Sequence, residues 1–177
     1  LQGDWSSDVC SSDLAFTVLA STSCNKNDDD CVDRFVGEYK ISITPNFMLT
    51  YSGYGTYNLT TDSPIETDCS ITNNDNNVTV KIKGINGVLN DIVISGRCDG
   101  LGMRLNDSDY DGYIRFNDND YVRCDINLRN PNVSSPYNGT MSWESSVSGS
   151  CRVDIFGMGE EVLCDVSGKI TFVANEK

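Results

Sequence analysis

The chain has 177 residues, with 26 acidic and 13 basic side chains, so its formal net charge at pH 7 is −13. This acidity repels phosphate backbones and anionic headgroups, so we expect no nucleic-acid partner. The sequence contains no histidine. It therefore lacks the commonest general base, the histidine-activated nucleophile pairs and the commonest zinc ligand, and we predict that the protein is not an enzyme.

The first fourteen residues differ in character from the rest of the chain. Residues 3–14 read GDWSSDVCSSDL, with no basic residue and no apolar periodicity. This peptide resembles the in-frame translation of a common sequencing adapter, so residues 1–14, Cys10 included, are excluded from the fold prediction. They carry three aspartates and no base, so the net charge of the remaining 163 residues is −10. That length suffices for one domain with its own core.

The next segment, AFTVLASTSC at residues 15–24, is followed by NKNDDDC. A short apolar run that ends in small residues before a cysteine resembles the end of a bacterial lipoprotein signal peptide, with residues 15–23 as its remnant. The resemblance implies that Cys24 is lipidated and that lipid alone holds the protein to a membrane. A plain secretory signal, or a buried strand followed by a loop, is the alternative reading.

Residues 24–34 then form the predicted tether. Lys26 followed by three aspartates resembles the surface-export signal of Bacteroidetes lipoproteins. The resemblance implies an outer-membrane lipoprotein exposed at the cell surface, or otherwise a periplasmic one. Such a run is also simply a solvated spacer that cannot pack into a core.

Residues 35–177 are predicted to form a single β domain. Apolar residues recur at every second position in GEYKISIT (37–44), NVTVKIKG (77–84), DIVISGRC (91–98), YVRCDINLR (121–129) and the stretch 150–173. Gly, Asn and Asp turns separate these segments. Strict alternation indicates antiparallel strands with one buried and one solvated face, as in a barrel or a sandwich.

The connections between these segments are short, which predicts a meander of sequentially paired strands. The segments FVGEYKI (35–41) and DVSGKITFVA (165–174) resemble the first and last strands of lipocalin-like and calycin-like barrels. The whole pattern resembles the calycin-like lipoproteins of Bacteroidetes. The resemblance implies an all-β fold in which an antiparallel meander forms a calycin-like barrel, with a β-sandwich as the alternative.

Six cysteines remain once Cys10 and Cys24 are set aside, an even number that favours disulfides in an exported chain. Cys151 and Cys164 form the best predicted pair, because they lie at equal distances from a turn at Gly157 and Met158. At a narrow cross-strand site their Cα atoms would be about 4.5 Å apart. Buried free thiols are the alternative for several of the six, which are Cys31, Cys69, Cys98, Cys124, Cys151 and Cys164.

One stretch, NDSDYDGYIRFND, resembles an EF-hand calcium loop. The resemblance implies carboxylate ligands from Asp107, Asp109 and Asp111, a carbonyl ligand from Tyr113, and a closing acid at Asp118. Such a site would be weak and structural, and we predict no other cofactor. The alternative is an acidic β-loop whose aspartates cap their own turns.

Two functional hypotheses follow. The first is a non-enzymatic binding module for a small apolar ligand or a glycan, with Tyr51, Tyr54 and Tyr57 as candidate contacts; ordinary packing is the alternative role of these rings. The second is a structural or adhesin-type interaction protein of the cell surface. An enclosed apolar cavity would favour the first hypothesis, and a filled core would favour the second. Trp143, which alternates with Met141, is expected in the core.

Overall fold

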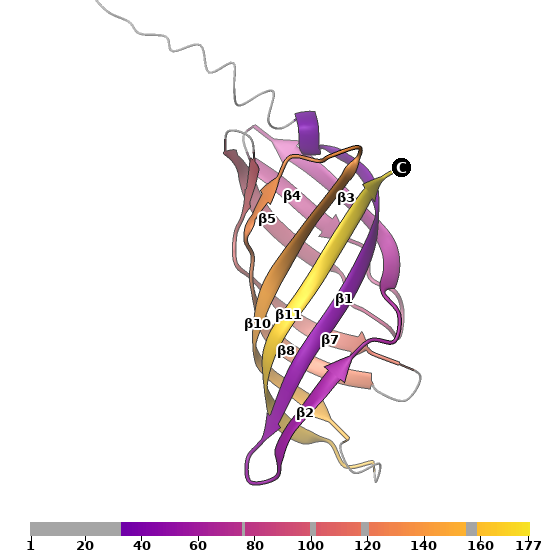
Figure 1. The fold of residues 1–177 in the computed structure, drawn as a ribbon, viewed down its shortest axis with the longest axis vertical. Helices are drawn as coiled ribbons and strands as arrows, with labels where there is room; N and C mark the ends of the chain where they lie inside the picture. The colour runs from indigo at the N-terminus through magenta and orange to yellow at the C-terminus, as the bar shows by residue number, and fades with distance from the viewer. Residues whose placement is uncertain (1–32, 76, 100–101, 118–120, 155–158) are drawn as a thin grey trace, which may run out of the picture.

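The computed structural model describes residues 33–75, 77–99, 102–117, 121–154 and 159–177 (Figure 1). The adapter-like segment, the signal-peptide remnant, Cys24, Cys31 and Asp118 lie outside these residues. A helical turn at residues 33–35 precedes the first strand. The strands are β1 (Gly37–Tyr51), β2 (Gly55–Thr60), β3 (Ile65–Asn74), β4 (Asn77–Ile82), β5 (Ile92–Asp99), β6 (Gly102–Leu105), β7 (Ser108–Arg115), β8 (Tyr121–Arg129), β9 (Asn132–Ser134), β10 (Thr140–Val153) and β11 (Val162–Glu176).

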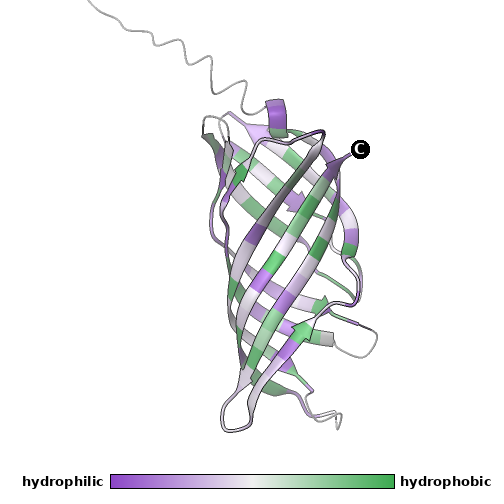
Figure 2. Cartoon of the chain, viewed as in Figure 1, coloured by the Kyte–Doolittle hydropathy of each residue, from purple (hydrophilic) through white to green (hydrophobic). Residues whose placement is uncertain are grey.

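The predicted alternation is confirmed along the strands. In β4, Val78, Val80 and Ile82 are buried while the residues between them are exposed. The same pattern appears as alternating colour along the strands in Figure 2. One face of each strand therefore contributes to a common core, because successive side chains of a strand point to opposite sides.

All the strands belong to one antiparallel sheet that is strongly curled, as a calycin-like barrel requires. Strand β6 pairs with β9, and β7 pairs with β8. The two pairs share one continuous register, since Gly102 lies opposite Ser134 and Ser108 lies opposite Leu128. The long hairpin they form joins β5 on one side and β10 on the other. The remaining pairs, β3–β4, β4–β5, β10–β11, β11–β1 and β1–β3, complete one continuous sheet that curls into a half-barrel. The β-sandwich alternative is wrong.

A buried polar cluster interrupts that long hairpin. Between β8 and β9, the side-chain amide of Asn130 donates to the backbone oxygen of Asn106 at 2.8 Å and to the Ser108 hydroxyl at 3.2 Å. Its oxygen accepts a hydrogen bond from the fully buried Ser145 hydroxyl at 2.5 Å. These bonds replace the ladder that the break removes, and so the backbone can bend without leaving buried groups unpaired.

Two glycines allow neighbouring strands to approach closely. A Cβ atom on Gly168 would lie 2.3 Å from the backbone oxygen of Asn46, and one on Gly149 would lie 2.4 Å from that of Asp125. Both have positive φ angles, 149° and 143°. Glycine is required at such points, because a side chain there would clash with the next strand and strain its own backbone.

The interior is filled by large side chains. The rings of Trp143 and Phe172 stack with centroids 4.8 Å apart, and Phe47 meets Phe116 edge-on at 5.3 Å. Trp143 is 5% exposed, which confirms its predicted place in the core. The largest fully buried side chains are Phe35, Phe47, Phe172, Ile41, Ile43, Ile71, Ile82, Ile94, Met103, Ile114, Ile126 and Leu128.

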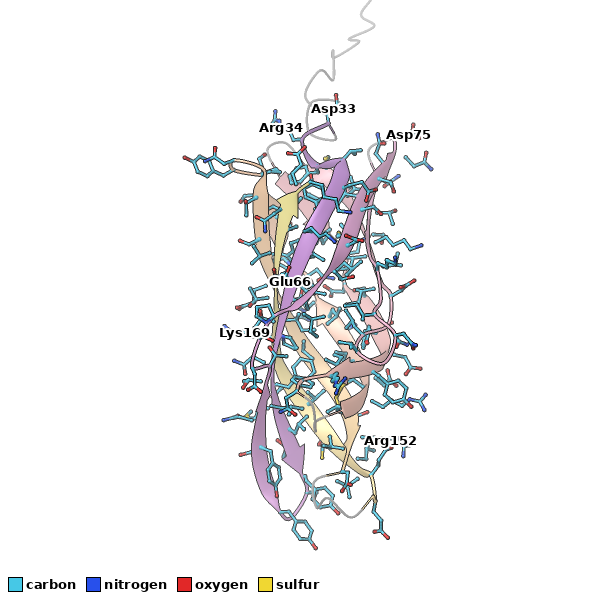
Figure 3. All side chains as sticks on the ribbon, turned by 90° about the vertical axis from the view of Figure 1, so that its right-hand side faces the viewer. Asp33, Arg34, Glu66, Asp75, Arg152 and Lys169 are labelled. Carbon is cyan, nitrogen blue, oxygen red and sulfur yellow. A yellow bond between two sulfur atoms is a disulfide. The ribbon has the colours of Figure 1, made fainter. Side chains whose placement is uncertain are left out.

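The two ends of the barrel differ. The first described residues and the C-terminus lie at one end, where the backbone amide of Lys177 donates to the Glu38 oxygen (Figure 1). The turn between β1 and β2 lies at the opposite end, in the lower part of the figure. Figure 3 shows the two ends in side view, with Asp33 and Arg34 at the end that holds the C-terminus and Arg152 near the opposite end.

Candidate functional site

The strand β1 pairs with two different strands along the same edge. Residues 37–43 pair with β3, whereas residues 46–51 pair on the same edge with β2. The hairpin closes where the backbone amide of Tyr54 donates to the Tyr51 oxygen at 3.0 Å. Gly53 and Gly55, with φ of 87° and 111°, accommodate the tight turn.

The three tyrosines predicted as ligand contacts gather on this hairpin. Tyr57 lies opposite the buried Leu49, so the two side chains share one face, and Tyr51 follows on that face two residues later. The rings of Tyr51 and Tyr54 stack with centroids 4.8 Å apart and planes 15° from parallel. Tyr54 is 66% exposed and Tyr57 is 39% exposed. The structure thus assembles an aromatic surface, which we call the tyrosine platform.

The strand β2 has a partner on one side only, among the described residues. It pairs with β1 and with no other described strand, so it lies outside the main order of neighbouring strands. Its side chains are polar, aromatic or aliphatic, without charge and without proline, in the sequence GTYNLT. Edge strands usually carry charges, prolines or bulges that discourage further pairing. This edge lacks charges and prolines, a feature that sequence reasoning missed because edge and interior strands alternate alike.

The outer surface near the hairpin is rich in hydrogen-bonding side chains. Thr50 lies opposite Thr56 across β1 and β2, and Asn46 lies opposite Thr60. On the neighbouring ladder, Ser148 lies opposite Ser167. These groups lie on the face opposite to Tyr51 and Tyr57, and charged residues lie among them, since Lys169 is opposite Asn46 and Asp165 is opposite Thr50.

The surface hollows of the described residues are open and largely polar. One lies over β7, β8 and β10, where the Arg123 guanidinium is 3.8 Å from the Asp111 carboxylate and 6.0 Å from the Tyr113 ring centroid. Its lining residues are Asp111, Arg123, Cys124, Asp125, Ser150, Arg152 and Glu161. The opposed signs within this hollow neutralise much of its charge, so it does not favour a strongly charged ligand.

The calcium-like motif is part of a strand and not of a loop. Asp109 and Asp111 belong to β7, and Asp107 precedes it. Residues two apart on a strand are separated by about 6.6 Å, so their carboxylates do not converge on one ion. Asp109 accepts a hydrogen bond from Asn127 at 3.0 Å, and Asp107 accepts one from the backbone amide of Asn130 at 3.2 Å.

Tyr113, the predicted carbonyl ligand, instead accepts a hydrogen bond from the hydroxyl of Tyr110 at 2.6 Å. In the part of the chain that the structure describes, no cluster of three or more His, Cys, Asp or Glu side chains is arranged to hold a metal ion. The described residues of the motif therefore do not form an EF-hand loop, and the closing acid, Asp118, lies outside them.

The predicted disulfide between Cys151 and Cys164 is wrong in its partner. Cys151 does lie opposite Cys164 in the β10–β11 ladder, as predicted, but it also lies opposite Cys124 in the β10–β8 ladder. The bond joins Cys124 to Cys151, whose Cα atoms are 4.1 Å apart, and Cys164 is a buried free thiol. Cys69 is a second buried free thiol, and Cys98 is disulfide-bonded. Sequence spacing predicts the register within a single hairpin, here β10–β11. It could not reveal that Cys151 also has Cys124 as a neighbour on β8.

Few titratable groups are perturbed within the described residues. A hydrogen bond from Lys40, and to a lesser extent one from Lys177, lowers the pKa of Asp68 to about 2. The lysine Nζ atoms lie 2.6 and 3.0 Å from the Asp68 Oδ1. Burial raises the pKa of Cys69 to about 12 and also raises the pKa of Cys164. Lys40 and Asp68 lie opposite each other on β1 and β3, which identifies this ion pair as part of the sheet surface.

No protein-family model matches the chain, and no curated protein matches it in sequence. No helix among the described residues is long and apolar enough to span a bilayer.

Proposed function

We propose that this protein is a lipid-anchored, non-enzymatic binding module of the cell envelope, and that its ligand is a glycan held on the tyrosine platform. The observation that carries the proposal is the stack of the half-buried Tyr51 and the exposed Tyr54 beside Tyr57 at the end of the β1–β2 hairpin. The apolar faces of sugar rings pack on flat aromatic rings, while the tyrosine hydroxyls form hydrogen bonds with the sugar hydroxyls.

The filled interior directs the proposal away from an internal cavity and to the uncovered end of the sheet at the β1–β2 hairpin. A ligand cavity would need open space between the core side chains. Instead, the ring of Phe47 contacts that of Phe116, and the ring of Trp143 contacts that of Phe172. Small apolar ligands prefer enclosed apolar cavities. A glycan needs only a shallow surface, so it is the better of the two ligand classes in the first hypothesis.

The position of the platform suits a protein tethered at its N-terminal end. The described chain begins at one end of the barrel, and the β1–β2 turn lies at the other (Figure 1). An anchor at Cys24 would therefore hold the platform away from the membrane. The disulfide between Cys124 and Cys151 further supports an oxidising compartment outside the cytoplasm.

Binding to immobilised neutral polysaccharides, namely mannan, xylan and a β-glucan, tests the proposal. We expect at least one of them to bind, and the Tyr54→Ala and Tyr57→Ala double variant to weaken that binding at least tenfold, which corresponds to about 1.4 kcal/mol. Tyr137→Ala is the matched control, because Tyr137 is 80% exposed and its backbone pairs with Thr140 at the other end of the barrel. Binding to none of the three, or equal binding by the double variant, contradicts the proposal.

A second candidate function rests on the open edge of β2. An extended segment of a partner protein could add to this edge as a further strand, with affinity from main-chain hydrogen bonds. This is the interaction-protein hypothesis, and the filled core favours it too. Replacing Asn58 by proline removes a backbone donor from β2. Loss of a protein partner on Asn58→Pro, with polysaccharide binding absent throughout, would favour this second function over the first.

A further inference from the structure

Three cysteines form a row across the inner face of the sheet. Cys124 on β8 lies opposite Cys151 on β10, and Cys151 lies opposite Cys164 on β11. All three are at most 1% exposed. The central cysteine therefore has a sulfur-bearing neighbour on each side, and only one of the two is bonded to it.

The two neighbours of Cys151 are not equivalent. In an antiparallel sheet, residues opposite each other alternate between narrow pairs, with Cα atoms about 4.5 Å apart, and wide hydrogen-bonded pairs at about 5.5 Å. The Cα distance of 4.1 Å identifies Cys124 and Cys151 as a narrow pair. The backbone groups of Cys151 then point toward β11, so Cys151 and Cys164 form a wide pair.

The narrow pair is bonded in the structure, and the wide pair lies within the range that a disulfide can bridge. Disulfides are found with Cα separations from about 4.4 to 6.8 Å, which includes a wide pair of about 5.5 Å. The narrow pair brings the Cβ atoms closer together, which favours the bond between Cys124 and Cys151 that the structure contains. Cys124 and Cys164 are two strand spacings apart, about 9.5 Å, and this exceeds the bridging range of about 7 Å.

We propose that Cys164 is an internal exchange thiol and that Cys151 is a sulfur shared between two alternative disulfides. The Cys164 thiolate attacks the sulfur of Cys151, the bond between Cys151 and Cys124 breaks, and a bond between Cys151 and Cys164 forms. Cys124 leaves as a thiolate and takes up the proton that Cys164 has lost. One disulfide and one thiol are present before and after, so the step needs no oxidant or reductant.

The exchange moves the crosslink from one ladder to the next. In the first isomer the disulfide joins β8 to β10, and in the second it joins the two strands of the β10–β11 hairpin. The buried position of all three sulfurs excludes external thiols, so the exchange stays within the row. This inference is independent of the glycan-binding proposal.

Peptide mapping of the purified full chain tests the exchange. Trypsin separates the three cysteines, because cleavage after Arg123, Arg129, Arg152 and Lys169 gives the peptides 124–129, 130–152 and 153–169. Free thiols are alkylated in denaturant at acid quench before digestion. In the wild-type protein we expect 124–129 linked to 130–152 as the main product and 130–152 linked to 153–169 as a minor one. Complete absence of the second product after prolonged incubation would overturn the exchange.

Two serine variants separate the shared role of Cys151 from a general tendency to oxidise. After oxidative folding, Cys124→Ser is expected to link 130–152 to 153–169, with loss of about 2 Da relative to the two free peptides. Cys151→Ser is expected to leave Cys124 and Cys164 as thiols. Free Cys151 and Cys164 in the first variant, or a bond between Cys124 and Cys164 in the second, would contradict the proposal.

The matched control is Cys69→Ser, which removes the other buried free thiol of the described residues and leaves the row intact. It is expected to give the wild-type map. Should Cys124→Ser fail to fold, as judged by circular dichroism, Cys124→Val fills the same buried site with an apolar side chain and leads to the same expectation. The wild-type measurement stands independently of either variant.

Discussion

The strand β1 borders two regions of the sheet that share the alternation of inward and outward side chains but differ in how well the inward side chains are covered. Its first half, residues 37–43, lies between β11 and β3, and its inward side chains Tyr39, Ile41 and Ile43 are at most 3% exposed. Its second half lies between β11 and β2, and its inward side chains Phe47 and Leu49 are also buried, whereas Tyr57 on the edge strand β2, which shares their face, remains 39% exposed. Alternation therefore decides which face a residue occupies, whereas the neighbouring strands decide whether that face is covered.

The largest expected effect is in the covered region. Phe172→Ala should lower the free energy of unfolding by about 3–5 kcal/mol, because it empties a fully buried site and removes the ring that stacks on Trp143. Urea denaturation followed by tryptophan fluorescence measures the loss. A loss below about 1 kcal/mol would mean that the core is loosely packed and that the comparison between the two regions fails.

The next effect lies where the two regions meet. Gly168 lies opposite Phe47, and Gly168→Ala should cost about 1–3 kcal/mol, because its Cβ would meet the backbone of β1 and its φ of 149° suits glycine alone. Gly87→Ala is the control, since Gly87 has a positive φ of 72° but open space around it. Thermal denaturation of both variants is expected to rank Gly168→Ala as the more destabilised, and the reverse order would contradict the close-approach argument.

The hairpin should respond little in stability. Tyr54→Ala removes an exposed ring, and we expect the free energy of unfolding to change by less than about 0.5 kcal/mol. The same variant is expected to weaken glycan binding, so the two measurements separate function from folding. A stability loss as large as that of Phe172→Ala would show that the tyrosine platform belongs to the core.

The smallest effect concerns the surface of the covered region and depends on pH. Lys40 and Lys177 lower the pKa of Asp68 from 3.8 to about 2. The carboxylate therefore contributes stability above pH 4, and this contribution is lost as the pH falls toward 2. Urea denaturation should show Asp68→Asn as slightly less stable than wild type at pH 6 and equal to it near pH 2. Lys40→Met should show the same trend, and a pH-independent difference would argue against the ion pair.

Much of this fold could be predicted from local patterns. The strands around GEYKISIT, NVTVKIKG and YVRCDINLR were predictable because a half-buried antiparallel strand needs an apolar residue at every second position. The facing of Cys151 and Cys164 was predictable because a hairpin turn fixes the register of its two strands. The buried Trp143 followed from the same alternation. The calcium-like spacing in 107–113 misled because acidic residues at alternate positions occur equally on the outer face of a strand.

The sequence by itself determined the all-β class, the inward and outward faces and the short connections, because these depend on residues close together in the chain. Only the tertiary structure decided which strand lies on the other side of each hairpin. That neighbour selects Cys124 over Cys164 as the partner of Cys151, and its absence leaves the edge of β2 open. The physical reason is that pairing between distant strands follows from closure of the whole sheet, which no local pattern encodes.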